Sequence, residues 1–155
     1  MNQTSNWLVH DHRKYEVALD ECDIAAGAEN WIDAIRLFNE FVDWFKFHVQ
    51  LEEDVLYPLF KQEFGDPGGE LTILSEEHDD LVRLLRDLVT VIKAKAYDHF
   101  EDSLKPFRKA IAEHNEHEER VFQRMGTDSI LTRRDEIMQR MDALQTETGR
   151  KSWDF

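Results

Sequence analysis

The sequence has very little cysteine and no long apolar run. Cys22 is its only cysteine, which excludes an intramolecular disulfide and a metal site of four thiolates. No stretch approaches the roughly 18 apolar residues that cross a membrane, and residues 1–7 lack the basic and apolar regions of a signal peptide. We therefore expect a soluble protein in which Cys22, on the apolar face of its helix, is a small core residue.

Basic side chains are also scarce. Lysine and arginine total 19 against 33 aspartates and glutamates, which gives a formal net charge of -14. Nucleic acids and anionic membranes bind through concentrated Lys and Arg, so neither is an expected partner. The excess of acid suits a cytoplasmic protein, and the length of 155 residues predicts one domain with a substantial core.

Apolar residues recur at helical spacing, and strand alternation is missing. The pattern predicts helices over residues 5–26, 30–64, 70–95, 98–125 and 129–146. Four long helices with short connections favour an all-α, up-down antiparallel four-helix bundle over about residues 6–126. Residues 127–155 then add a C-terminal packing helix and a loosely ordered tail to the same single domain, 1–155.

Local signals set the expected helix ends. The expected N-caps and terminating glycines are Ser5, Asn30, Asp98, Asp128, Gly27 and Gly126. Asp98 and Glu101 have the spacing of a capping box. Pro58 should bend the second helix near Asp54, and Pro106 should kink or restart the fourth, because proline lacks a donor and crowds the preceding turn.

One motif occurs twice. His48-x3-Glu52-Glu53 recurs as His114-x3-Glu118-Glu119, 66 residues later, and the same offset relates His12 to His78. Residues four apart on a helix lie on one face, so a His and a Glu with this spacing can bind one metal. A single His-x3-Glu pair is weak evidence, but four His and two Glu under one offset are specific.

These repeated groups fall on the apolar faces of their helices. A single buried His is more often a satisfied core residue, but six such groups without a cation would each cost about 1–3 kcal/mol. A centre of two metals resolves this, since two imidazoles per ion and two bridging carboxylates give each ion four protein ligands. The expected ligands are His12, His48, Glu52, His78, His114 and Glu118. Mixed imidazole and carboxylate ligation suits iron, and less selectively manganese or zinc.

The motifs resemble those of the hemerythrin-like proteins of the HHE cation-binding family. The resemblance covers about residues 7–126 and includes Asp11-His12, His48-x3-Glu52 with Leu56-Tyr57-Pro58, Glu77-His78 and His114-x3-Glu118. It implies two iron ions with an oxo or hydroxo bridge. On that analogy His12 and His48 bind one iron, His78 and His114 bind the other, and Glu52 and Glu118 bridge them.

The sequence departs from the oxygen-carrying hemerythrins in one respect. Those proteins have a further His one turn before the third-helix His, where this sequence has Leu74. Leucine cannot bind a metal, so the second iron should lack one ligand. Oxygen carriers also place the last carboxylate five residues after the fourth-helix His, at Glu119, but the helical face selects Glu118.

Two further side chains are less favoured members of the site. Glu16 lies one turn after His12 and could supply an extra ligand. His117 lies on the shoulder of its helix, where a supporting or surface role is the better interpretation.

Three functions fit these observations. The first is a protein that binds or senses dioxygen, peroxide or nitric oxide, or handles iron, rather than carrying oxygen. The second is a di-iron enzyme that decomposes peroxide, reduces nitric oxide or repairs iron centres. The third is a bundle without redox metal whose acidic faces and C-terminal helix bind a second copy or a protein partner.

Overall fold

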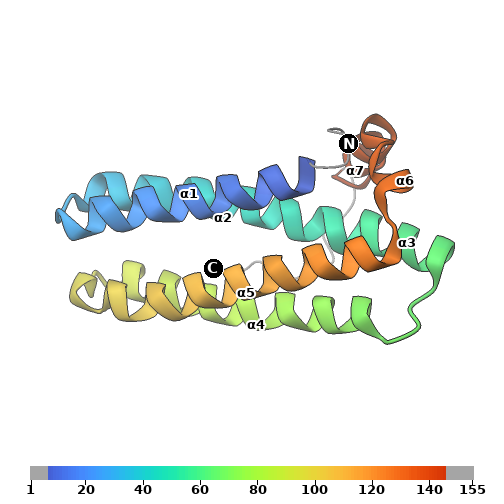
Figure 1. The fold of residues 1–155 in the computed structure, drawn as a ribbon. Helices are drawn as coiled ribbons and strands as arrows, with labels where there is room; N and C mark the ends of the chain where they lie inside the picture. The colour runs from blue at the N-terminus through green and yellow to red at the C-terminus, as the bar shows by residue number, and fades with distance from the viewer. Residues whose placement is uncertain (1–6, 146–155) are drawn as a thin grey trace.

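The computed structural model describes residues 7–145, and every regular element in that range is a helix (Figure 1). The elements are α1 (Trp7–Gly27), α2 (Trp31–Leu51), a π-helical segment (Glu52–Leu56), α3 (Tyr57–Phe64), α4 (Glu70–Lys93), a 3₁₀ turn (Tyr97–His99), α5 (Phe100–Met125), α6 (Asp128–Leu131) and α7 (Arg134–Gln145). The predicted all-helical bundle is confirmed. None of the described helices is long and apolar enough to cross a membrane.

The long helices lie side by side. Helix α1 packs against α2, α4 packs against α5, and α1 also contacts α5, with each long helix running opposite to the one before it (Figure 1). Helices α6 and α7 lie at the end of the bundle where α1 begins. There the Trp7 indole donates a hydrogen bond to the Leu131 carbonyl at 3.0 Å, which ties the C-terminal helices to the bundle.

Two apolar clusters fill the interior. The first cluster contains Phe38, Phe41, Phe45, Leu81, Leu85, Phe107 and Ile111 among others. The second contains Leu8, Val55, Phe60, Leu74, Val121, Ile137 and Met141 among others. On α1, α4 and α5 the predicted His and Glu positions fall between the residues of these two clusters. The polar groups therefore form a layer with apolar packing above and below it.

Several predicted helix ends are confirmed. The Asn30 side chain accepts a hydrogen bond from the Asp33 amide, as an N-cap does. Gly126 ends α5 with a φ of 73°, a conformation that glycine adopts without strain. Cys22 is fully buried, as expected, and burial raises the pKa of its thiol to about 12. Ser5 and the tail after residue 145 lie outside the described residues.

The predicted capping box is wrong. The 3₁₀ turn contains Asp98, and α5 begins at Phe100 without a side-chain cap. The Tyr97 ring stacks on Trp31 with centroids 4.6 Å apart, which holds this segment in a turn instead of an N-cap. Helix α5 also runs through Pro106 without restarting.

The C-terminal segment differs from the prediction as well. The single helix expected over residues 129–146 is two helices, α6 and α7, separated by a turn. Asp128 is the first residue of α6, whereas Thr127 stands at the N-cap position, and its hydroxyl donates to the Phe122 carbonyl instead of capping α6. Both helices still pack on the second cluster, because Ile130 and Ile137 are buried there.

The second helix departs from regular α-helical geometry in the turn before Pro58. The five residues Glu52–Leu56 form a π-helical segment, in which the Tyr57 amide bonds to the Glu52 carbonyl. The wider turn adds one residue and rotates the next turns of the helix about its axis. Tyr57 and Phe60 are therefore buried, while Leu59, which the regular pattern places inside, is only partly buried.

Candidate metal centre

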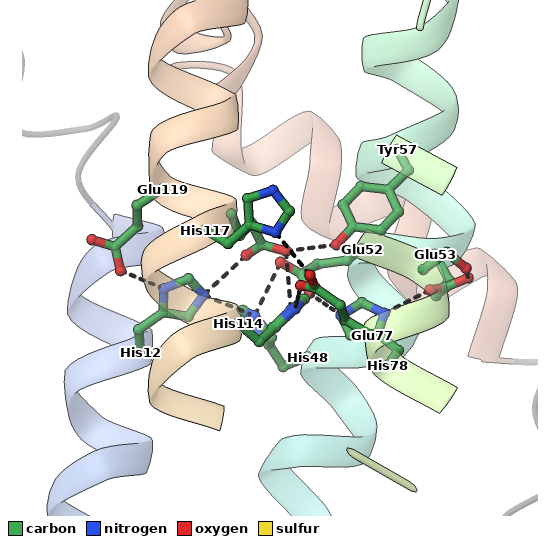
Figure 2. A network of polar contacts seen from close by, with 12 residues as sticks. His12, His48, Glu52, Glu53, Tyr57, Glu77, His78, His114, His117 and Glu119 are labelled. Atoms are coloured by element: carbon green, nitrogen blue, oxygen red, sulfur yellow. Dashed lines mark hydrogen bonds and ion pairs between the residues drawn. The ribbon is translucent and has the colours of Figure 1, made fainter. Parts of the chain in front are cut away.

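Six side chains converge in the polar layer from α1, α2, the π-helical segment, α4 and α5 (Figure 2). All are at most 5% exposed, although each is a histidine or a glutamate. Their ligand atoms form two groups, within which all atoms lie no more than 4.8 Å apart. The first group is His12, His48, Glu52 and Glu118, and the second is Glu52, His78, His114 and Glu118. Both glutamates belong to both groups.

Each imidazole turns its Nε2 atom toward a shared carboxylate. Glu52 lies 3.2 Å from the Nε2 of His48 and 3.0 Å from that of His78. Glu118 lies 3.1 Å from the Nε2 of His12 and 3.6 Å from that of His114. Glu52 therefore contacts one histidine of each group, His48 and His78. Glu118 does the same with His12 and His114. This is the arrangement that two bridging carboxylates require.

A second ring of carboxylates holds the outer nitrogens of three histidines. The Nδ1 of His12 donates to Glu119 at 2.9 Å, the Nδ1 of His78 donates to Glu53 at 2.6 Å, and the Nδ1 of His114 donates to Glu77 at 2.7 Å. An ionised carboxylate only accepts hydrogen bonds, so these contacts place a proton on Nδ1. They orient each ring and leave Nε2 available as a metal ligand.

Further side chains support this outer ring. The Ser75 hydroxyl donates to Glu53 at 2.7 Å, and the Nδ1 of His117 donates to Glu77 at 2.8 Å. His117 is therefore a supporting residue outside both ligand groups, as its place on the helix suggests. Glu16 is also outside both groups.

The outer contacts follow the sequence repeat across the molecule. His12 pairs with Glu119, and the residues 66 positions away from these, His78 and Glu53, pair in the same way. The two halves of the chain therefore hold each other's histidines. This crossing explains why Glu53 and Glu119 follow the central glutamates in both copies of the motif.

The repeat fails at one contact. Glu77 accepts from His114, and its counterpart in the first half is Asp11, whose partner would be His48. The Nδ1 of His48 is buried without a hydrogen bond. Aspartate is one methylene shorter than glutamate, so the carboxylate at position 11 does not reach as far as Glu77 does.

Tyr57 is a site residue that the helical pattern misses. Its hydroxyl donates to Glu118 Oε2 at 2.6 Å, and its ring stacks on His78 with centroids 5.7 Å apart. The π-helical segment brings Tyr57 inward, five residues after Glu52. The sequence gives two signals for it: Tyr57 belongs to the motif Leu56-Tyr57-Pro58 that resembles the family, and a helix disturbed by Pro58 changes which later residues face the core.

Burial and hydrogen bonding compete in setting the protonation of the histidines. Burial lowers the pKa of His12 and of His114, but their close contacts with Glu118 and their hydrogen bonds with Glu119 and Glu77 outweigh it and raise both to about 10. Burial and the neighbouring His12 lower the pKa of His48 to about 3. Metals bind neutral imidazole, so metal binding at this cluster releases protons.

The two central carboxylates differ. Burial and the charge of Glu118 raise the pKa of Glu52 to about 8. Burial also acts on Glu118, but its close polar contacts with Glu52, His114 and His12 hold its pKa well below the usual range. Two buried carboxylates this close together require positive charge between or beside them.

The residues present fit a pair of first-row metal ions. Among the central atoms that are buried without hydrogen-bond geometry are both Glu52 oxygens, Glu118 Oε1, and the Nε2 atoms of His78 and His114. They lie at ion-pair distances from one another but lack the directions of hydrogen bonds. Each would cost about 1–3 kcal/mol if left without a partner. Nitrogen and oxygen donors without sulfur suit iron, manganese or zinc.

The unpartnered His48 nitrogen leads to a prediction. Asp11→Glu should extend a carboxylate to the Nδ1 of His48 and raise metal affinity by roughly tenfold, because such outer contacts change affinity by about 10–100-fold. Glu77→Asp should have the opposite effect on the equivalent contact of His114. Competition with a chelator of known affinity measures both. Equal affinities in the wild type and both variants would contradict the proposed roles of positions 11 and 77.

Comparison with known proteins agrees with this geometry. The model of the hemerythrin HHE cation binding domain matches residues 3–126, which include all six central side chains. A search of curated proteins and a search of solved structures gave no match. The match ends just after α5, and α6 and α7 lie beyond it. Since the matched region spans most of the chain, the protein belongs to the hemerythrin HHE cation-binding family.

Proposed function

We propose that the chain is a hemerythrin-like up-down four-helix bundle with a non-haem di-iron centre. The proposed ligands are His12 and His48 for one iron, His78 and His114 for the other, and Glu52 and Glu118 for both. The observation that carries the proposal is that the two groups of buried ligand atoms share both glutamates. Side chains that only filled a core would have no reason to form two groups related in this way.

The function that this site supports best is binding or sensing of a small diatomic or peroxide ligand. When bound, a pair of irons supplies Lewis acidity and one-electron redox chemistry to such a ligand. The protein fixes the imidazoles through their Nδ1 contacts and places two apolar clusters beside the site. Apolar walls keep competing water out and strengthen the electrostatic interactions inside.

One side chain distinguishes this site from that of the oxygen carriers. Leu74 is fully buried one turn before His78, where oxygen-carrying hemerythrins have a further histidine. The second iron then has fewer protein ligands and a coordination position that small molecules can occupy. Such a centre exchanges small ligands more readily than the centre of an oxygen carrier.

Removal of one central carboxylate tests the proposed ligands. Glu52→Gln and Glu118→Gln should each lower iron affinity more than about a hundredfold and at both sites, because each carboxylate belongs to both groups. Metal analysis after dialysis against a weak chelator gives the occupancy.

The matched controls are Glu53→Gln and Glu119→Gln. The amide oxygen can still accept from the Nδ1 of His78 or His12, so a loss of about tenfold or less is expected. If the central and outer variants lost iron equally, the assignment of Glu52 and Glu118 as the bridging residues would be wrong.

Introducing the histidine of the oxygen carriers tests the role of Leu74. Leu74→His should strengthen iron binding and dioxygen binding, because the new imidazole lies one turn from His78 on the same face. Leu71→His is the control, since Leu71 is also buried but lies further from His78 along α4. Visible spectra of both variants, loaded with iron and exposed to air, measure the effect. Identical spectra for Leu74→His and wild type would count against the missing-ligand explanation.

A further inference from the structure

The outer face of α1 carries a stripe of ordered charge. His10, Arg13, Val17, Glu21 and Ile24 follow one another at intervals of three and four residues, so they lie on one side of the helix. Val17 and Ile24 are 53% and 73% exposed, which is high for aliphatic residues. Along this stripe two basic residues are followed by an apolar, an acidic and a second apolar residue.

The stripe borders a groove between α1 and α2. The groove has a volume of about 400 Å³, and its lining includes Arg13, Val17 and Glu21 from α1 and Leu37, Glu40 and Trp44 from α2. Trp44 is 49% exposed, yet its ring packs on the buried Tyr15 at a centroid distance of 6.4 Å. The indole is therefore fixed against the bundle with one side open. Fixed, half-exposed aromatics are typical of protein interfaces.

We propose that this face binds a second copy of the chain, related by a two-fold axis through Val17. Arg13 and Glu21 lie four residues before and after Val17, which places each about 6 Å from it along the helix. A perpendicular two-fold axis reverses the second helix, so Arg13 faces the partner subunit's Glu21 and Glu21 faces the partner subunit's Arg13. Both contacts form at once, one on each side of Val17.

The charges favour a second copy over other partners. A uniformly acidic or basic partner would be repelled by one end of the stripe, whereas an antiparallel copy matches both ends. Among the described residues, neither Arg13 nor Glu21 forms an ion pair within the chain, while Glu40 binds Arg36 at 3.2 Å. The net charge of -14 opposes association at long range. At physiological salt this repulsion is screened beyond about 8 Å, so the direct contacts decide.

The size of the face sets the expected affinity. Helices α1 and α2 have 21 residues each, and two such helices side by side present a face about 30 Å long and about 20 Å wide. This area is at the lower end of stable interfaces, which bury about 800 Å² per partner. We therefore expect a dimer with a dissociation constant in the range of about 1–100 µM.

Charge exchange on the full chain tests this dimer. Arg13→Glu and Glu21→Arg should each raise the dissociation constant by about tenfold or more, because each puts like charges face to face in both contacts. The double variant exchanges the two charges and should restore the wild-type value within about threefold. Lys61→Glu on α3 is the control, since it changes the net charge as Arg13→Glu does but lies far from the groove. Sedimentation velocity over a range of concentrations gives each constant.

A further variant places the change on the axis itself. Val17→Asp would set two carboxylates against each other and should leave only monomer. Val17 is exposed, so the fold is not at risk. A wild type that stays monomeric at about 1 mM would overturn the proposal, since that concentration reveals even weak dimers. A double variant whose dissociation constant is as high as those of the single variants would overturn it too. So would a Lys61→Glu variant whose dissociation constant rises as much as that of Arg13→Glu.

Discussion

Two fully buried carboxylates, Glu52 and Glu118, impose the constraint that the rest of this bundle satisfies. A buried carboxylate is stable only when it is paired, protonated or bound to metal. Four imidazoles surround this pair, and three of them are held from outside by further carboxylates. The apolar clusters on both sides fix the helices that carry these groups. Packing and polar chemistry therefore support each other in one layer.

The repeat of the sequence becomes a reciprocal contact in the structure. Each half contributes a central glutamate, and each half's outer glutamate binds a histidine of the other half. The same relation makes the exceptions informative. Asp11 in place of a glutamate leaves a His48 nitrogen unpartnered, and the π-helical segment brings Tyr57 to one side of the site only. The two proposed metal positions thus have similar ligands but different surroundings.

Helical periodicity predicts most of this from sequence, because a face that must be buried repeats at fixed intervals. It predicts the long helices and places all six central side chains inside the bundle. It fails where local structure departs from the regular helix, as at Tyr57, whose burial depends on one added residue in a turn. It also fails at Asp98, where the stacking of Tyr97 on Trp31 decides the conformation. The contacts of Glu53, Glu77 and Glu119 depend on distances between helices, which periodicity does not provide.

The most direct measurement is the number of iron ions that the purified chain binds in an anaerobic titration with Fe(II), together with the visible spectrum after exposure to air. The two ligand groups that share Glu52 and Glu118 predict about two irons per chain. They also predict the absorption of a bridged di-iron centre in the oxidised protein. Binding of a single iron, or no binding, would contradict a centre in which both carboxylates serve two metals.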